Sequence, residues 1–206
     1  QRGILGQFSS TAPESITVNS NTITGTTGAA VDLQNTGAGS SLTADISGNT
    51  LATAAGQGVT VQSIGSNSKI NIAANGNIIS GTTGIGLNVS TLGNDSGITA
   101  VVSNNAINAT SGQGVNIQAN GATSPVNATV TSNTLSGLTG FGVNVSTSFS
   151  DAPLTASVSN NTITTSSQGI SLQTSGTGSA LNGTVLGNVL NGTSGIGINL
   201  AAFTFG

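Results

Sequence analysis

Apolar and polar side chains alternate in short runs along almost the whole chain. Residues 154–158, Leu-Thr-Ala-Ser-Val, show the pattern, because every second side chain is apolar. A period of two predicts strands with one buried face. No segment carries the 3.6-residue apolar stripe of an amphipathic helix, so the pattern predicts an all-β protein.

The strand pattern repeats every 28 residues. Seven coils fill residues 13–206 and begin at positions 13, 41, 69, 97, 125, 153 and 180, so the sixth coil is one residue shorter than the others. Each coil contains a period-two run, an Asn-x-Ile/Leu segment and a Gly-Val-x-Val segment, which predict three short strands. Gly and Asn stand between the segments, where corners tolerate a positive φ. Residues 1–12 precede the repeat as an N-terminal extension, interpreted as a donated strand or a cap and partly resembling the third strand of a preceding coil.

A single coil cannot bury its own apolar face, but identical coils stacked in register can. Stacking at about 4.8 Å per coil would turn the three strands into three parallel sheets around an aliphatic core. The sequence therefore predicts a single-domain parallel β-helix. Because crossovers between parallel strands are nearly always right-handed, the coil is expected to be right-handed as well.

The ninth position of every coil is Asn. An inward amide carries both donors and an acceptor, so it can bond the same residue in the coils above and below and satisfy buried backbone groups at a corner. This structural ladder is favoured over ligand coordination as the role of the column. Its members are Asn21, Asn49, Asn77, Asn105, Asn133, Asn161 and Asn188.

Two phrases of the repeat carry a family resemblance. Val-Ser-Asn-Asn-Thr-Ile-Thr at 158–164 and Ser-Gly-Gln-Gly-Val-Asn-Ile at 111–117 resemble right-handed parallel β-helix repeats of secreted bacterial proteins. Those families include autotransporter-type adhesins, surface fibres, and polysaccharide lyases and epimerases. The resemblance implies the fold and an extracellular or cell-surface location, but it leaves the function open because one fold hosts many roles.

Composition removes several function classes. Only 3% of the residues are charged, the cations are Arg2 and Lys69, and His and Cys are absent. Without these ligands and bases, zinc, haem, iron–sulfur and Ser–His–Asp chemistry are not expected, and neither is any cofactor. Two cations make no footprint for nucleic acid, and no apolar run reaches the roughly 20 residues of a membrane-spanning helix.

An enzyme remains a weaker alternative. Asp95 and Asp151 share one repeat position two coils apart, a separation of about 10 Å, which approaches the carboxylate spacing of inverting glycosidases. Neither has a polar cluster beside it in the sequence, so both are interpreted as solvated turn residues, and a calcium site at Asp95 is weaker still. Ice binding is also less favoured, because the outward columns mix Thr with Asn, Ser and Ala.

The two ends of the predicted rod suggest a function. A solenoid exposes unpaired strand edges and core at each end, and no polar cap is evident in this sequence. Apolar residues gather at both termini, and Glu14 replaces the Leu, Ile or Val found at its position in every other coil. We expect Glu14 to blunt the first coil against wrong pairing, with Arg2 as its partner. The expected subunit contacts are Ile4, Leu5, Phe8, Glu14, Phe203 and Phe205.

The hypothesis is a non-enzymatic subunit of a head-to-tail filament or surface fibre. Residues 1–12 would complete or cover the core of a neighbour, or fold back as a private cap. The alternative is a fragment of a cell-surface adhesin that binds glycan or a host surface. End-to-end self-association is thus the expected partnership.

Overall fold

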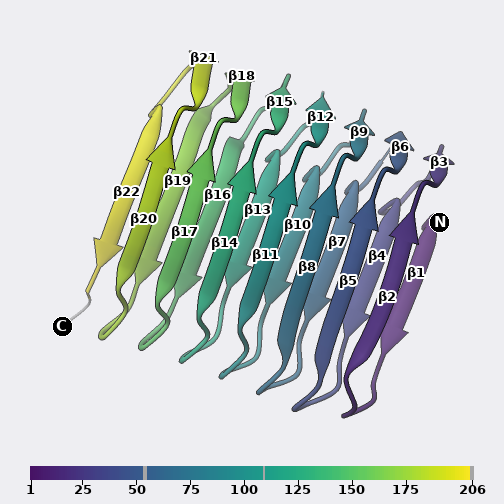
Figure 1. The fold of residues 1–206 in the computed structure, drawn as a ribbon, viewed down its shortest axis with the longest axis vertical. Coiled ribbons are helices and arrows are strands. Elements are labelled where there is room, and N and C mark those ends of the chain that lie inside the picture. Colours follow the sequence, from purple (N-terminus) through teal and green to yellow (C-terminus); the bar gives the residue numbers. More distant parts are fainter. Residues whose placement is uncertain (53–54, 109, 205–206) are drawn as a thin grey trace.

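The computed structural model describes residues 1–52, 55–108 and 110–204. Within them the chain forms 22 strands and no helix, arranged as three parallel sheets. The coils follow one another along a single rod, with the N-terminal coil at one end and the C-terminal coil at the other (Figure 1). The prediction of an all-β parallel solenoid with coils of about 28 residues is confirmed, and its right-handedness stays a prediction.

Each coil contributes one strand to each sheet, in the order sheet B, sheet C, sheet A. Sheet A contains β1 (Ile4–Phe8), β4 (Val31–Asn35), β7 (Val59–Ser63), β10 (Leu87–Thr91), β13 (Val115–Ala119), β16 (Phe141–Ser148), β19 (Gln168–Ser175) and β22 (Ile198–Phe203). Sheet B contains β2 (Glu14–Asn19), β5 (Ser41–Ser47), β8 (Lys69–Asn75), β11 (Ile98–Ser103), β14 (Val126–Thr131), β17 (Leu154–Ser159) and β20 (Leu181–Leu186). Sheet C contains β3 (Thr22–Thr24), β6 (Thr50–Ala52), β9 (Ile78–Ser80), β12 (Ala106–Asn108), β15 (Thr134–Ser136), β18 (Thr162–Ser166) and β21 (Val189–Thr193).

The pairing register follows the repeat. Val59 pairs with Leu87, and Leu87 with Val115, each 28 residues further along. The short sixth coil shortens the offset by one residue once in each sheet, where Val143 pairs with Ile170, Leu154 with Leu181 and Thr162 with Val189. Its missing residue lies at the corner between β18 and β19, which are separated by one residue there. A deletion at a corner leaves every inward column in place, which is why the solenoid tolerates it.

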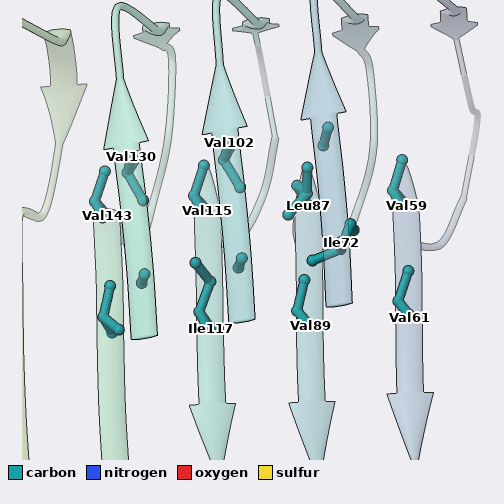
Figure 2. Close-up of a cluster of buried hydrophobic side chains, with 14 of the residues drawn as sticks. Val59, Val61, Ile72, Leu87, Val89, Val102, Val115, Ile117, Val130 and Val143 are labelled. Atoms are coloured by element: carbon teal, nitrogen blue, oxygen red, sulfur yellow. The ribbon is translucent and has the colours of Figure 1, made fainter. Parts of the chain in front are cut away.

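The core is a set of aliphatic columns running along the rod. Figure 2 shows side chains of sheet A, such as Val59, Leu87 and Val115, facing side chains of sheet B such as Val102 and Val130. All five are fully buried. Because each side chain meets its counterpart in the coils above and below, an interior coil has no open face, whereas an end coil does.

One glycine column is required by this packing. A Cβ on Gly86 would lie 2.4 Å from Cγ2 of Ile107 in the next coil, and one on Gly58 would lie 2.5 Å from Cγ2 of Ile79. The first coil carries the buried Ala30 in this column, and the facing position of the next coil is Leu51, which has no Cγ2. The corner between sheets C and A is therefore matched to the branching of the residue that packs against it.

Candidate functional site

The asparagine column forms a continuous ladder along the corner between sheets B and C. The backbone N–H and the Nδ2 of each member donate to Oδ1 of the next member, both at 2.9–3.0 Å. From Asn49 onward, Nδ2 also donates to a backbone carbonyl of the preceding coil at 2.7–3.0 Å. The five members between Asn49 and Asn161 are at most 1% exposed. Their amides are fully occupied by the protein itself, so the geometry assigns them to structure and leaves no group free for a ligand.

The ladder is unfinished at both ends. Among the described residues, no donor reaches Oδ1 of Asn21, and the backbone N–H of Asn188 has no acceptor. The Asn188 N–H and the Asn21 Oδ1 are the same donor and acceptor that form the hydrogen bond between neighbouring coils elsewhere in the ladder. One end of the solenoid therefore presents an acceptor and the opposite end the matching donor.

A second ladder, of serines, lies at the corner between sheets A and B and was missed in the sequence. The N–H of Ser68 donates to Oγ of Ser96, and the N–H of Ser96 donates to Oγ of Ser124, at 3.1 and 3.0 Å. Each of these hydroxyls donates in turn to a carbonyl of the preceding coil. The signal was available, because these serines occupy the last position of consecutive coils.

The acidic residues of the described chain do not gather into a cluster that could hold a metal ion. No group of three or more His, Cys, Asp or Glu side chains occurs within the part of the chain that the structure describes. Asp95 and Asp151 have φ angles of 57° and 55°. The Asp95 carboxylate accepts a hydrogen bond from the Thr123 hydroxyl. Both residues thus occupy left-handed positions that favour Asp and Asn, as expected of turn residues.

A shallow groove follows the outer face of sheet B. Its floor is the backbone of inward-facing residues such as Ala100 and Ala128, and its walls are the two neighbouring columns of outward side chains, which are mostly Thr, Ser and Asn. Hollows of about 360, 190 and 240 Å³ succeed one another along it, and all three include Thr99 in their lining. The groove offers hydroxyls and amides at regular intervals, with a half-exposed Val101 among them.

At the N-terminal end, β1 covers part of the first coil. It pairs with β4 of its own chain from Ile4↔Val31 to Phe8↔Asn35, so residues 4–8 form the third strand of a partial coil. Gly6 leaves room above Leu33, and the Phe8 ring lies beside it, since a Cβ on Gly6 would meet both side chains within 3.0 Å. The aromatic ring therefore closes part of the core that an ordinary coil would cover with an aliphatic side chain.

The charged residues of this end are arranged differently from the sequence-based expectation. Nε of Arg2 contacts the Asp32 carboxylate, whose side chain is 6% exposed, so the partner of Arg2 is Asp32 and not Glu14. Glu14 starts β2 opposite Leu42 and is half-buried at the inward position of its column. The expected Arg2–Glu14 pair does not form. The β1–β4 pairing places Asp32 opposite Leu5, and this brings the Asp32 carboxylate within reach of Arg2. The Glu14 carboxylate thus stands at the open edge of sheet B.

The C-terminal end is open. Ile198 and Leu200 continue the core columns of sheet A but are 48% and 52% exposed, because no coil covers them. Phe203, at the end of β22, is 51% exposed, and Leu186 and Val189 are exposed as well. Ile198 and Leu200 thus belong to an apolar cross-section that no further strand covers among the described residues, whereas Phe203, Leu186 and Val189 occupy columns that face outward along the whole rod.

The predicted contact residues thus divide between the two ends. Ile4 and Phe8 are half-buried against the core, and Leu5 is 47% exposed on the outer face of sheet A. Phe203 lies at the opposite end of the rod, and Phe205 lies outside the described residues. Among the described residues, no two from opposite ends are brought together within one chain (Figure 1).

Comparisons with known proteins return no match: no family model, no curated protein and no solved structure resembles this chain at a significant level. The described residues also contain no helix of the length and apolarity needed to cross a membrane. The evidence for function therefore comes from the geometry alone.

Proposed function

We propose that this protein is a non-enzymatic structural subunit that associates head to tail into an extracellular or cell-surface fibre. The supporting observation is the mismatch between its two ends. The C-terminal end presents an uncovered apolar cross-section and a free Asn188 N–H, and the N-terminal end presents the free Oδ1 of Asn21. Ends that complement each other without self-complementarity generate open filaments.

The mechanism of such a fibre is mechanical. Parallel backbone ladders run through all three sheets, and two side-chain ladders brace two of the corners. The low charge serves the same purpose, because identical charges stacked about 4.8 Å apart would repel one another. Uncharged Ser, Thr and Asn can stack on themselves, and a surface with 3% charged residues resists association weakly.

Charge placed on one end provides the test. Leu200→Lys puts an ammonium group on the open C-terminal cross-section, and Thr129→Lys puts the same group on the exposed face of sheet B, remote from both ends. We expect the parent chain and Thr129→Lys to form fibres in negative-stain images and to sediment as large species. Leu200→Lys should stay as single rods. Single rods from all three proteins would overturn the proposal.

Adhesion is the second candidate function, and the groove on sheet B supports it. A glycan could lie along the row of hydroxyls and amides that includes Thr99, Asn127 and Thr155. Glycan-array binding by the parent chain, lost in Asn127→Leu and kept in Leu200→Lys, would favour this role. Binding that is unaffected by Asn127→Leu would exclude the groove.

A further inference from the structure

The three sheets do not contain the same number of strands. Sheet A has eight, whereas sheets B and C have seven each, and the additional strand is β1. If a second copy added its β1 to β22, one strand would be missing between β20 and the second copy's β2. Another strand would be missing between β21 and the second copy's β3. Those edges would stand about 9.6 Å apart instead of about 4.8 Å and would remain unpaired.

The strands β1 and β22 occupy equivalent places in the repeat. Ile4 pairs with Val31 at one end, and Ile198 pairs with Ile170 at the other, and Val31 and Ile170 belong to the same core column. Strand β22 of a second copy could therefore lie on β4 in the place of β1. It would bring an inward leucine, Leu200, to the position where β1 has only Gly6.

We propose that β1 is a displaceable cap, and that β22 of a second copy replaces it on β4 when the fibre grows. This proposal rests on head-to-tail association and specifies its seam. With β1 released, β20 would lie on the second copy's β2 and β21 on its β3, so all three sheets would continue across the junction. Asn188 would then meet Asn21 and complete the asparagine ladder.

The cap is held along one edge only. Beside the pairing of β1 with β4, residues 1–8 are fastened by the Arg2–Asp32 ion pair and by a 3.5 Å hydrogen bond from Gln7 to Gln34. The Gln1 carbonyl accepts hydrogen bonds from the Thr27 and Gly28 N–H groups at 3.1 and 3.0 Å, and the Phe8 carbonyl accepts from the Thr36 N–H at 2.7 Å and from its hydroxyl at 3.2 Å. The outer edge of β1 has no neighbouring strand. A cleft of about 410 Å³ lies between residues 1–3 and β3, at the edge where β21 of the second copy would bind. The cap therefore protects the edge of β4 in the single molecule and can be exchanged for a strand that covers it better.

Disulfide trapping distinguishes displacement from simple addition, and the chain has no cysteine of its own. In the displaced seam Ala201 of one copy lies beside Gln34 of the next, whereas in an added seam it lies beside Gln7, because all three share one column. Adjacent Cα positions at about 4.8 Å fall within the range that a disulfide spans. Ala201→Cys is mixed with Gln34→Cys in one experiment and with Gln7→Cys in the other, under mild oxidation.

We expect a cross-linked dimer with Gln34→Cys and at least about ten-fold less with Gln7→Cys. Adding Arg2→Ala, which removes the ion pair of β1, should accelerate the first cross-link by about five-fold. A dominant cross-link to Gln7→Cys would overturn displacement and leave the fibre in place. If neither pair cross-links and the parent chain forms no fibres, the proposed function fails together with the seam.

A cap locked to its own chain gives an independent measurement. Gln7→Cys combined with Gln34→Cys in one molecule joins β1 to β4, because these residues are direct partners in the register. The oxidised protein should remain as folded single rods, and reduction should restore fibre growth. Fibres that grow equally from the oxidised protein would show that β1 stays in place.

Discussion

The two ends of this solenoid are built from the same repeat but are finished differently. The N-terminal end carries β1, the Phe8 ring over Gly6, and the Glu14 carboxylate at the edge of sheet B. The C-terminal end has none of these, and Ile198 and Leu200 are about half-exposed there, at 48% and 52%. One end is thus partly protected and the other is ready to be covered. In the proposed fibre, this difference would favour addition at the C-terminal end while the repeat itself stays unchanged.

The largest expected effect is a difference in the free energy of unfolding between variants in the interior of the asparagine ladder and variants at its ends. Asn105→Ala removes the acceptor of the Asn77 N–H and the donor to the Ala74 carbonyl, both in the buried interior. We expect a loss of about 4 kcal/mol in the free energy of unfolding, since each unpaired buried group costs about 1–3 kcal/mol. Asn188→Ala should cost only about 1 kcal/mol, because water reaches its half-buried end of the ladder.

Urea unfolding of both variants measures this difference. Asn21→Ala serves as the control, because no donor among the described residues uses its Oδ1. Equal losses in Asn105→Ala and Asn188→Ala would mean that the ladder is not what stabilises the interior coils.

The second prediction addresses the asymmetry of the ends. Phe8→Ala uncovers Leu33 beside Gly6 and should make the N-terminal end as open as the other, at a cost of about 2 kcal/mol for a half-buried aromatic side chain. Phe203→Ala removes a ring that is 51% exposed and should cost less than about 0.5 kcal/mol. Hydrogen exchange of β4 and of β19 reports each end separately. Faster exchange in β19 than in β4 for both variants would contradict the comparison.

Glu14 provides a smaller test of end protection. Glu14→Leu restores the aliphatic residue that every other coil has at this position, so it should strengthen association and raise stability by up to about 1 kcal/mol. Glu14→Gln removes the charge while keeping the shape, and it separates electrostatic from apolar effects. The concentration at which fibres appear is the measurement. An unchanged concentration in both variants would show that Glu14 does not restrain pairing.

The smallest effect is a pH dependence of the N-terminal coils that comes from Asp45. Hydrogen bonds from the Ser47 hydroxyl, at 2.5 Å, and from Nδ2 of Asn19, at 3.2 Å, hold the pKa of the Asp45 carboxyl below its usual value. Since the folded state favours the ionised form, this stabilisation is present above the usual pKa and is lost as the pH falls through the lowered one. Thr184 holds the same position in the last coil and does not titrate.

Carbon-detected NMR titration should therefore give a lowered pKa for Asp45. Acidification should loosen β2 before β20 in hydrogen exchange, because only the first of these strands is bonded to Asp45. Ser47→Ala should return the pKa toward the usual value, and an unaltered titration in that variant would remove the assigned cause.

Much of this architecture was readable from periodicity. The alternation of apolar residues fixes which face of each strand is buried, and the 28-residue spacing fixes which residues stack. The asparagine column could be placed at a corner, because stacked amides can hydrogen-bond to one another and to the backbone groups that a corner leaves unpaired. The serine column carries the same information, but it is interrupted by Ala152 and was not recognised.

The side-chain contacts at the ends could not be predicted from the repeat, because the residues that make them lie outside it. Arg2 pairs with Asp32 since β1 folds onto β4 of its own chain, and this pairing depends on how the first coil closes. The role of Phe8 depends in the same way on the space left above Leu33 by Gly6. Neither contact belongs to the repeat.

The sequence by itself determined the coil, its register and its core, because these follow from the spacing of side chains within a repeated unit. Only the tertiary structure decided that sheet A has one strand more than its neighbours, and that the two ends are capped unequally. The physical reason is that a repeating pattern specifies the contacts between neighbouring coils. An end has a neighbour on one side only, so its contacts depend on how the chain folds back there.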